Sequence, residues 1–255
     1  MPDYYRSLTA LHEAWEGCTR CALSERRESF PFCHMVHGSG PTGGVMVIGE
    51  GPGKTEEEEG SPFVGKSGQL LRIQLENFGL LDDCYMTNIV LCRSCKPLEI
   101  NGEVVKLRGE ITMEDTPPRY PHIEACRPRL MNEIYLVDPI IILAVGRSAA
   151  EALAGGNVKI VKETGSIRTV GVPGVTKEAC LTEKRRVWRR KVKGKMVAPV
   201  RPYMVRYPLM PIVHPSFVLR DLENTALNSP MHRFTDAINT LKRILDMRKE
   251  LYGER

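Results

Sequence analysis

The sequence predicts an α/β fold, a three-layer sandwich with a short central parallel sheet between helices. Four short apolar runs are nearly continuous rather than alternating, as is typical of strands buried on both faces; they cover residues 44–49, 84–91, 138–146 and 209–213. Apolar residues at spacings of three and four indicate helices at 66–79, 121–137, 147–154 and 230–250. The sequence therefore favours strands that alternate with helices.

One domain over residues 1–255 follows from the length, because 255 residues that are 42% hydrophobic can bury a large core. Two stretches break the α/β pattern, and we expect hairpin-like insertions at about 96–120 and about 181–207. The N-terminus lacks the charged-then-apolar order of a signal peptide, and no apolar run reaches the roughly 20 residues of a membrane span. We expect an intracellular, cytoplasmic protein without membrane contact, and a monomer.

A basic segment at residues 183–206 carries ten Lys or Arg against one acid, with Trp188 and Tyr203 interleaved. This composition is typical of a surface that tracks nucleic-acid phosphates, and Arg185 and Arg189 are candidate contacts. The alternative is a solvated β-hairpin that turns at Gly194. The net charge of +5 permits a polyanionic partner without requiring one.

Residues 45–71 run from the first predicted strand into a glycine-rich loop. The first functional question is which ligand this loop binds. It is not a Walker A loop, because Ile48 stands where that motif needs glycine. The dinucleotide fingerprint fails at Lys54, and the four glutamates 56–59 would repel a polyphosphate. Close backbone approach to another kind of ligand is the better interpretation. The acidic run itself is most simply a solvated helix start or turn.

Polar residues stand at the ends of three predicted strands. Glu50 follows the first, Asn88 lies near the end of the second, and His214 follows the fourth. Because ligands bind beyond the carboxyl ends of parallel strands, these side chains are expected to converge on one crevice. Taken singly, Asn88 could be a turn former and His214 a structural residue.

The eight cysteines include two CxxC pairs, "CTRC" at 18–21 and "CRSC" at 92–95. Two thiolates at that spacing can fold around one metal, and in an intracellular chain a disulfide framework is less expected. An entire βα unit separates the pairs, unlike a zinc ribbon, so the spacing leaves zinc and iron–sulfur both open.

Five motifs in order resemble the iron–sulfur (family 4) uracil-DNA glycosylases: "CTRCALSERR", "GEGPGKTEEEEGSPFVGKSGQLL", "TNIVLCR", "IEACRPRL" and "HPSFVLR". The resemblance covers nearly the whole chain apart from the two insertions. It implies the uracil-DNA glycosylase fold, removal of uracil from DNA in base excision repair, and a 4Fe-4S cluster. The cluster ligands that it implies are Cys18, Cys21, Cys92 and Cys126, with Cys95 as a possible substitute because the spacing to Cys126 is about twice the usual.

The resemblance also implies roles in the pocket. Phe63 would stack under a flipped uracil, Asn88 would read its edge, and Gly51 and Gly53 would let the backbone approach. His214 would donate to the carbonyl where negative charge collects, and Glu50 would position water or offset the positive charge of the sugar. These two are the catalytic candidates.

The segment "HPSFVLRD" is expected to hold the DNA. Val218 and Leu219 stand where this superfamily inserts an apolar wedge into the base stack, and Arg220 and Ser216 are candidate DNA contacts. The alternative is a Val-Leu pair that faces the core. A branch of the family cross-links to DNA through a histidine in "RRIH", and no such segment is present here, so we expect turnover.

Two other functions compete with this one. A non-catalytic binding protein for uracil-containing or single-stranded DNA would keep the pocket without Glu50 and His214, yet both are present. A zinc-stabilised nucleotide-binding protein would need a complete phosphate motif, which this sequence lacks.

Overall fold

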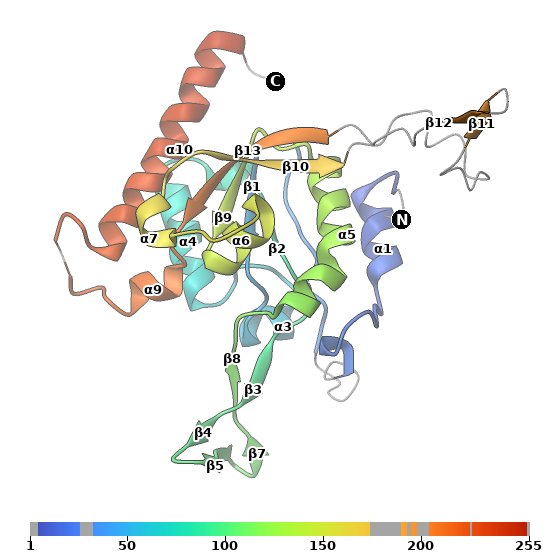
Figure 1. Ribbon diagram of the computed structural model, residues 1–255. Helices are drawn as coiled ribbons and strands as arrows, with labels where there is room; N and C mark the ends of the chain where they lie inside the picture. The colour runs from blue at the N-terminus through green and yellow to red at the C-terminus, as the bar shows by residue number, and fades with distance from the viewer. Residues whose placement is uncertain are drawn as a thin grey trace.

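The computed structural model describes residues 5–25, 33–173, 190–192, 195–197, 204–224 and 226–253. Its centre is a five-stranded sheet with the order β10-β13-β9-β1-β2 (Figure 1). The strands are β1 (Val45–Gly49), β2 (Cys84–Asn88), β9 (Ile141–Val145), β10 (Arg168–Pro173) and β13 (Met204–Ile212).

Four of these strands are parallel, which confirms the predicted fold class. Every residue of β1, β2 and β9 is buried, as expected of strands covered on both faces. The edge strand β10 runs antiparallel to β13 and was not predicted from the sequence. Its residues alternate between buried and exposed positions, so it lacks the continuous apolar run that identified the others.

Helices cover both faces of the sheet (Figure 1). Helices α1 (Leu8–Trp15) and α5 (Tyr120–Val137) lie on one side and contact each other. On the other side lie α4 (Lys66–Asn77), α9 (Pro215–Leu219) and α10 (Pro230–Tyr252). The shorter elements are α3 (Lys54–Glu59), η1 (Leu81–Asp83), α6 (Arg147–Ala154) and α7 (Ile160–Glu163). None of the helices in the described ranges is long and apolar enough to cross a bilayer.

The first insertion is a projecting antiparallel arm (Figure 1). At its base, β3 (Cys95–Pro97) pairs with β8 (Met113–Asp115). Two smaller ladders follow, β4 (Glu99–Ile100) with β5 (Glu103–Val104) and β6 (Lys106–Leu107) with β7 (Glu110–Ile111). The hairpin-like character predicted for this stretch is therefore confirmed.

The second insertion falls mostly outside the described residues. Within it, β11 (Arg190–Val192) pairs antiparallel with β12 (Lys195–Val197), as a hairpin requires. The candidate DNA contacts Arg185 and Arg189 lie outside the described residues.

The structure corrects the expectation that the acidic run at residues 56–59 is fully solvated. Residues 54–59 form α3, and Glu57 is buried rather than solvated. Its carboxylate lies 3.6 Å from Nη1 of Arg93, which is buried as well. An ion pair between buried groups explains how one member of the run of glutamates can face inward.

Candidate active site

The carboxyl ends of the parallel strands meet at one edge of the sheet and form a hollow there. Gly49 lies opposite Asn88 in the register of β1 and β2, and Val145 lies opposite Ile212 in that of β9 and β13. A cavity of about 310 Å³ opens beyond these ends. Six of the sequence-predicted residues line it, and they are Gly51, Gly53, Phe63, Asn88, His214 and Ser216. Of the three residues predicted to converge on one crevice, Asn88 and His214 therefore share this cavity.

Phe63 forms an apolar wall of this cavity and is held in an unusual backbone conformation. Its φ is 57°, in the left-handed region that bulky residues rarely adopt. Arg72 on α4 secures the segment through bonds from Nε to the carbonyl of Phe63 (2.9 Å) and from Nη2 to that of Pro62 (3.1 Å). At Gly68, any Cβ would collide with the backbone of Phe63, so the first turn of α4 needs glycine there.

Asn88 lies beside Phe63 at the end of β2 and is only 3% exposed. A Cβ at Gly49 would clash with the side-chain oxygen of Asn88 and with the Phe63 ring. Glycine at position 49 therefore lets an amide and an aromatic face share one small space.

Two carboxylates in the cavity were not among the predicted site residues. Glu56 accepts hydrogen bonds from the N–H groups of Gly53 and Gly65, each at 3.0 Å, and so joins the two glycine turns. Asp115 comes from the base of the arm and bonds Nε of Arg93 at 2.5 Å. The motif "GKTE" could have signalled Glu56 as a capping residue, whereas nothing local indicates that the arm returns Asp115 to the cavity.

His214 caps the N-terminus of α9, and its hydrogen bonds indicate its tautomer. The backbone N–H of Ser216 donates to Nδ1 at 3.1 Å, and the Ser216 hydroxyl lies 2.8 Å from the same atom. An Nδ1 that accepts leaves the proton of the neutral ring on Nε2. Burial lowers the pKa of His214, although the charge of Glu50 partly opposes this shift, so the ring is neutral near pH 7.

Glu50 lines an adjoining hollow of about 540 Å³ rather than the first cavity. Its Oε1 accepts from the backbone N–H of Ser148 at 2.9 Å, in the first turn of α6. Gly146, whose φ is 92°, precedes that helix, and a Cβ there would lie 2.5 Å from Oε1 of Glu50. The Glu50 carboxylate therefore lies at the positive end of the α6 helix dipole. His214 lines both this hollow and the first cavity.

The loop after His214 corrects part of the wedge hypothesis. Val218 is fully buried in the core, so it is not part of an exposed wedge. Leu219 is partly buried, whereas Phe217 is 38% exposed and lines the second hollow. Arg220 is exposed and lines the same hollow, together with Arg147.

Three of the four cysteines that the resemblance implies as cluster ligands, Cys18, Cys92 and Cys126, lie on or beside α1 and α5. Cys18 and Cys92 both pack against a small apolar cluster of Leu11, Trp15, Met35 and Leu91. Cys126 is buried on α5, which contacts α1. Within the described ranges, no three His, Cys, Asp or Glu side chains are grouped closely enough to hold a metal ion.

Comparison with protein families defines the class of this chain. Residues 37–242 match the model of the uracil DNA glycosylase superfamily. The chain therefore belongs to the uracil-DNA glycosylase superfamily, in agreement with the sheet and with a cavity at its carboxyl edge.

Its relatives within that superfamily carry a narrower name. The chain is 32% identical over 181 residues to the type-4 uracil-DNA glycosylase of Pyrobaculum aerophilum, across 69% of this chain and 81% of that protein. It is 30% identical over 159 residues to the type-4 enzyme of Thermotoga maritima, across 61% and 71%. With the relative from Sulfurisphaera tokodaii it shares 32% identity across 57% of each chain. The resemblance to the type-4 family is thus confirmed.

Proposed function

We propose that this protein is a uracil-DNA glycosylase, which flips deoxyuridine out of DNA and hydrolyses its N-glycosidic bond. The observation that carries the proposal is the lining of one cavity by Phe63, Asn88 and His214 at the carboxyl edge of the sheet. The names of the type-4 relatives point to the same substrate. In the reaction the C1′–N1 bond breaks and uracil leaves with the bonding electrons, while water oxygen bonds to C1′ and the proton that the water loses ends on uracil.

Phe63 and Asn88 recognise the base in this proposal. The buried aromatic face of Phe63 stacks on the uracil ring, which is a favourable contact for any planar base. The amide of Asn88 adds selectivity, because it offers an acceptor to N3–H and a donor to the neighbouring carbonyl of uracil. The bonds from Arg72 fix Phe63 before the substrate arrives, which lowers the cost of ordering the pocket.

His214 and Glu50 act on the charges that develop as the bond breaks. The Nε2–H of His214 donates to the uracil carbonyl where negative charge gathers, while Ser216 holds the opposite ring nitrogen. Glu50 faces the positive sugar from the second hollow, or it positions the attacking water there. Glu50→Gln separates these two roles, because a large loss of rate supports stabilisation of the sugar cation and a small loss supports water positioning.

The second hollow fits the DNA strand around the flipped nucleotide. Arg147 and Arg220 present exposed cations there, and Lys54 and Lys66 stand at the first cavity. Phosphate contacts of this kind hold the duplex in register without reading its sequence. Phe217, together with Leu219, supplies the apolar surface that enters the base stack.

We also propose a 4Fe-4S cluster on Cys18, Cys21, Cys92 and Cys126. In support, Cys18 and Cys92 share one apolar cluster, and the α1–α5 contact brings the helix of Cys126 toward the N-terminal pair. The donor chemistry is suitable, since four thiols are the usual ligands of such clusters. Glycosidic cleavage transfers no electrons, so the cluster would join distant segments of the chain rather than take part in the reaction.

The test of the function is excision of uracil from a labelled oligonucleotide under single-turnover conditions. The wild type should excise uracil, and His214→Ala should be slower by about 100-fold or more, as when one donor to a developing oxyanion is removed. Affinity for uracil-containing DNA should change only a few fold, because the interaction is made chiefly in the transition state. Equal rates for wild type and variant would show that His214 has no catalytic role.

A further inference from the structure

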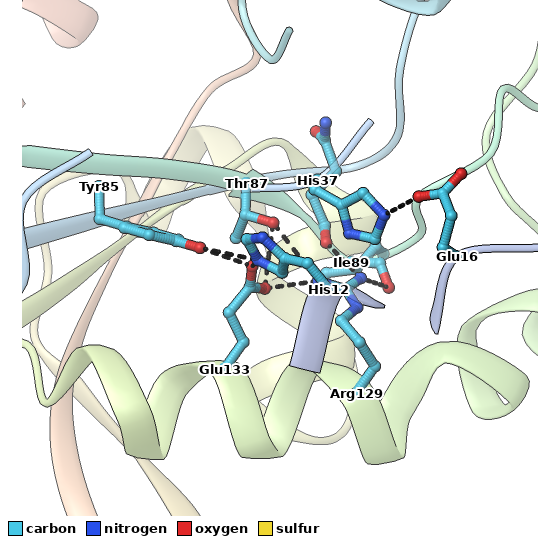
Figure 2. A network of polar contacts seen from close by, with 9 residues as sticks. His12, Glu16, His37, Tyr85, Thr87, Ile89, Arg129 and Glu133 are labelled. Carbon is cyan, nitrogen blue, oxygen red and sulfur yellow. Dashed lines mark hydrogen bonds and ion pairs between the residues drawn. The ribbon is translucent and has the colours of Figure 1, made fainter. Parts of the chain in front are cut away.

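A buried ion pair lies directly behind the proposed uracil-reading residue. Arg129 and Glu133 stand one turn apart on α5, and both side chains are 0% exposed. Their atoms Nη1 and Oε2 are 2.5 Å apart. Figure 2 shows this pair at the centre of a polar network that joins α5 to the end of β2.

Arg129 directs the rest of its guanidinium to the backbone of β2. Its Nη2 donates to the carbonyl of Asn88 at 2.8 Å and to that of Ile89 at 3.1 Å. Its Nη1 also reaches the hydroxyl of Thr87 at 3.3 Å. The next amide, that of Ile89, donates to the carbonyl of Gly49 at 2.9 Å. One side chain thus fixes three consecutive residues at the point where β2 enters the cavity.

Glu133 is fixed in turn from three directions. The Tyr85 hydroxyl donates to Oε1 at 2.9 Å, the Thr87 hydroxyl donates to Oε2 at 3.1 Å, and Nε2 of His12 lies 3.7 Å from Oε1. Burial alone would raise the pKa of Glu133, but the charge of Arg129 and the contacts with His12 and Tyr85 outweigh it and keep the pKa below its ordinary value. Glu133 therefore stays charged and keeps Arg129 in place.

Stability alone does not account for such a pair. Replacement of a buried ion pair by packed apolar residues is often neutral or stabilising, so its presence calls for a geometric role. An arginine can meet that role because its planar fork presents donors in fixed directions to the carboxylate and to two carbonyls at once. Lysine offers one charged nitrogen on a flexible stem and cannot hold the same three acceptors in place.

We propose that Arg129, anchored by Glu133, is a positioning residue that sets the orientation of Asn88 and thereby the selectivity for uracil. This inference rests on the proposed function, because it assigns a support to the residue that reads the base. Arg129 itself touches no substrate. Its effect passes through the two carbonyls that it holds at the end of β2.

The experiment uses free uracil as the probe, since the base alone occupies the pocket without the flipping of a nucleotide. The inhibition constant of uracil is measured for the wild type, Arg129→Lys and Glu133→Gln, alongside the excision rate and the melting temperature. In Arg129→Lys, uracil should inhibit about 10-fold more weakly, because a shifted Asn88 loses one good hydrogen bond to the base. Glu133→Gln, which keeps size but loosens the anchor, should weaken inhibition in the same direction and less.

Ile238→Val is the matched control, because Ile238 is fully buried on α10, on the other side of the sheet from the Arg129–Glu133 pair. It should lower the melting temperature like the other two variants and leave inhibition by uracil unchanged. Weaker inhibition in Arg129→Lys alongside unchanged inhibition in Ile238→Val supports the positioning role. Inhibition that tracks the melting temperature across all three variants overturns it and leaves Arg129 a structural residue. If the wild type excises no uracil, the proposed function itself is wrong. If the wild type is active and uracil inhibits Arg129→Lys and Glu133→Gln as strongly as the wild type, only the positioning role of Arg129 is wrong.

Discussion

Asn88 faces the cavity with a neutral amide, and the amide is the chemistry that uracil requires. In Asn88→Asp a carboxylate replaces the N–H donor, so the uracil carbonyl that it met is left without a partner. We expect kcat/KM on uracil-containing DNA to fall by about 10- to 100-fold and the preference for uracil over cytosine to narrow. The measurement is steady-state excision from paired oligonucleotides that differ in one base. Asn224→Asp, in an exposed loop, serves as a control and should match the wild type.

The neutral state of His214 predicts how stability depends on pH. Its pKa lies below the ordinary value of 6.5 because of burial, so below pH 6.5 the unfolded chain binds this proton more readily than the folded one. The contribution of His214 is therefore intact above pH 6.5 and is lost as the pH falls toward its folded pKa. Melting temperatures of wild type and His214→Ala, measured between pH 8 and pH 5, should converge as the pH falls. A constant difference across that range would contradict a depressed pKa.

Single residues also show where sequence reasoning ends. Arg93, Glu57, Arg129 and Glu133 all carry charge, and composition alone assigns such residues to the surface. Each is buried because its partner comes from another part of the chain or from the next helical turn. No local pattern records the pairing of Arg93 with Glu57, and the i,i+4 spacing of Arg129 and Glu133 is the same as that of an exposed helix pair. By contrast, Asn88 and His214 could be found, because Asn88 is a polar residue near the end of one apolar run and His214 directly follows another.

Among the secondary-structure elements, the buried strands were predicted best, because each is marked by a continuous apolar run in the sequence. The strands β1, β2 and β9 fall within the predicted ranges, since burial on both faces requires an unbroken apolar stretch. β13 begins earlier than predicted, because residues 204–208 alternate in burial where they pair with β10. Helix α3 agrees with the helix start that was one of two interpretations of the acidic run, but burial of Glu57 against Arg93 was not predicted.

The basic segment is the element whose function rests on sequence alone. If residues 184–195 track the DNA backbone, exchange of Lys184, Arg185, Arg186, Arg189 and Arg190 for Ala should weaken binding similarly for all sequences. The slope of log affinity against log salt should become less steep by about 0.9 for each DNA phosphate that the variant no longer neutralises. Titrations at several salt concentrations measure this slope. A slope equal to that of the wild type would return the segment to the solvated-hairpin interpretation.

At the scale of the whole molecule, the four proposed cluster ligands come from the N-terminal segment, the segment after β2 and helix α5. Protein purified without oxygen should be brown, with four iron atoms per chain, because thiolate–iron charge transfer absorbs visible light. Cys126→Ala should lose iron and melt at a lower temperature, whereas Cys84→Ala should keep its iron. Cys84 is a suitable control because burial raises the pKa of its thiol to about 12 and its Sγ donates to the carbonyl of Leu80. Colourless protein with stoichiometric zinc would contradict the proposal.

The ladder between β3 and β8 divides the arm into two parts that differ in how well they should tolerate changes of sequence. Asp115 ends the ladder at the cavity, while the stretch 98–112 closes on itself beyond it. Because the entropy of closing a loop grows only slowly with its length, an epitope tag or a fluorescent reporter could be spliced in at the Asn101–Gly102 turn for little cost in folding free energy. The arm therefore offers a site for inserting a foreign sequence that lies far from the reacting atoms. The same arm still contacts the cavity through Asp115.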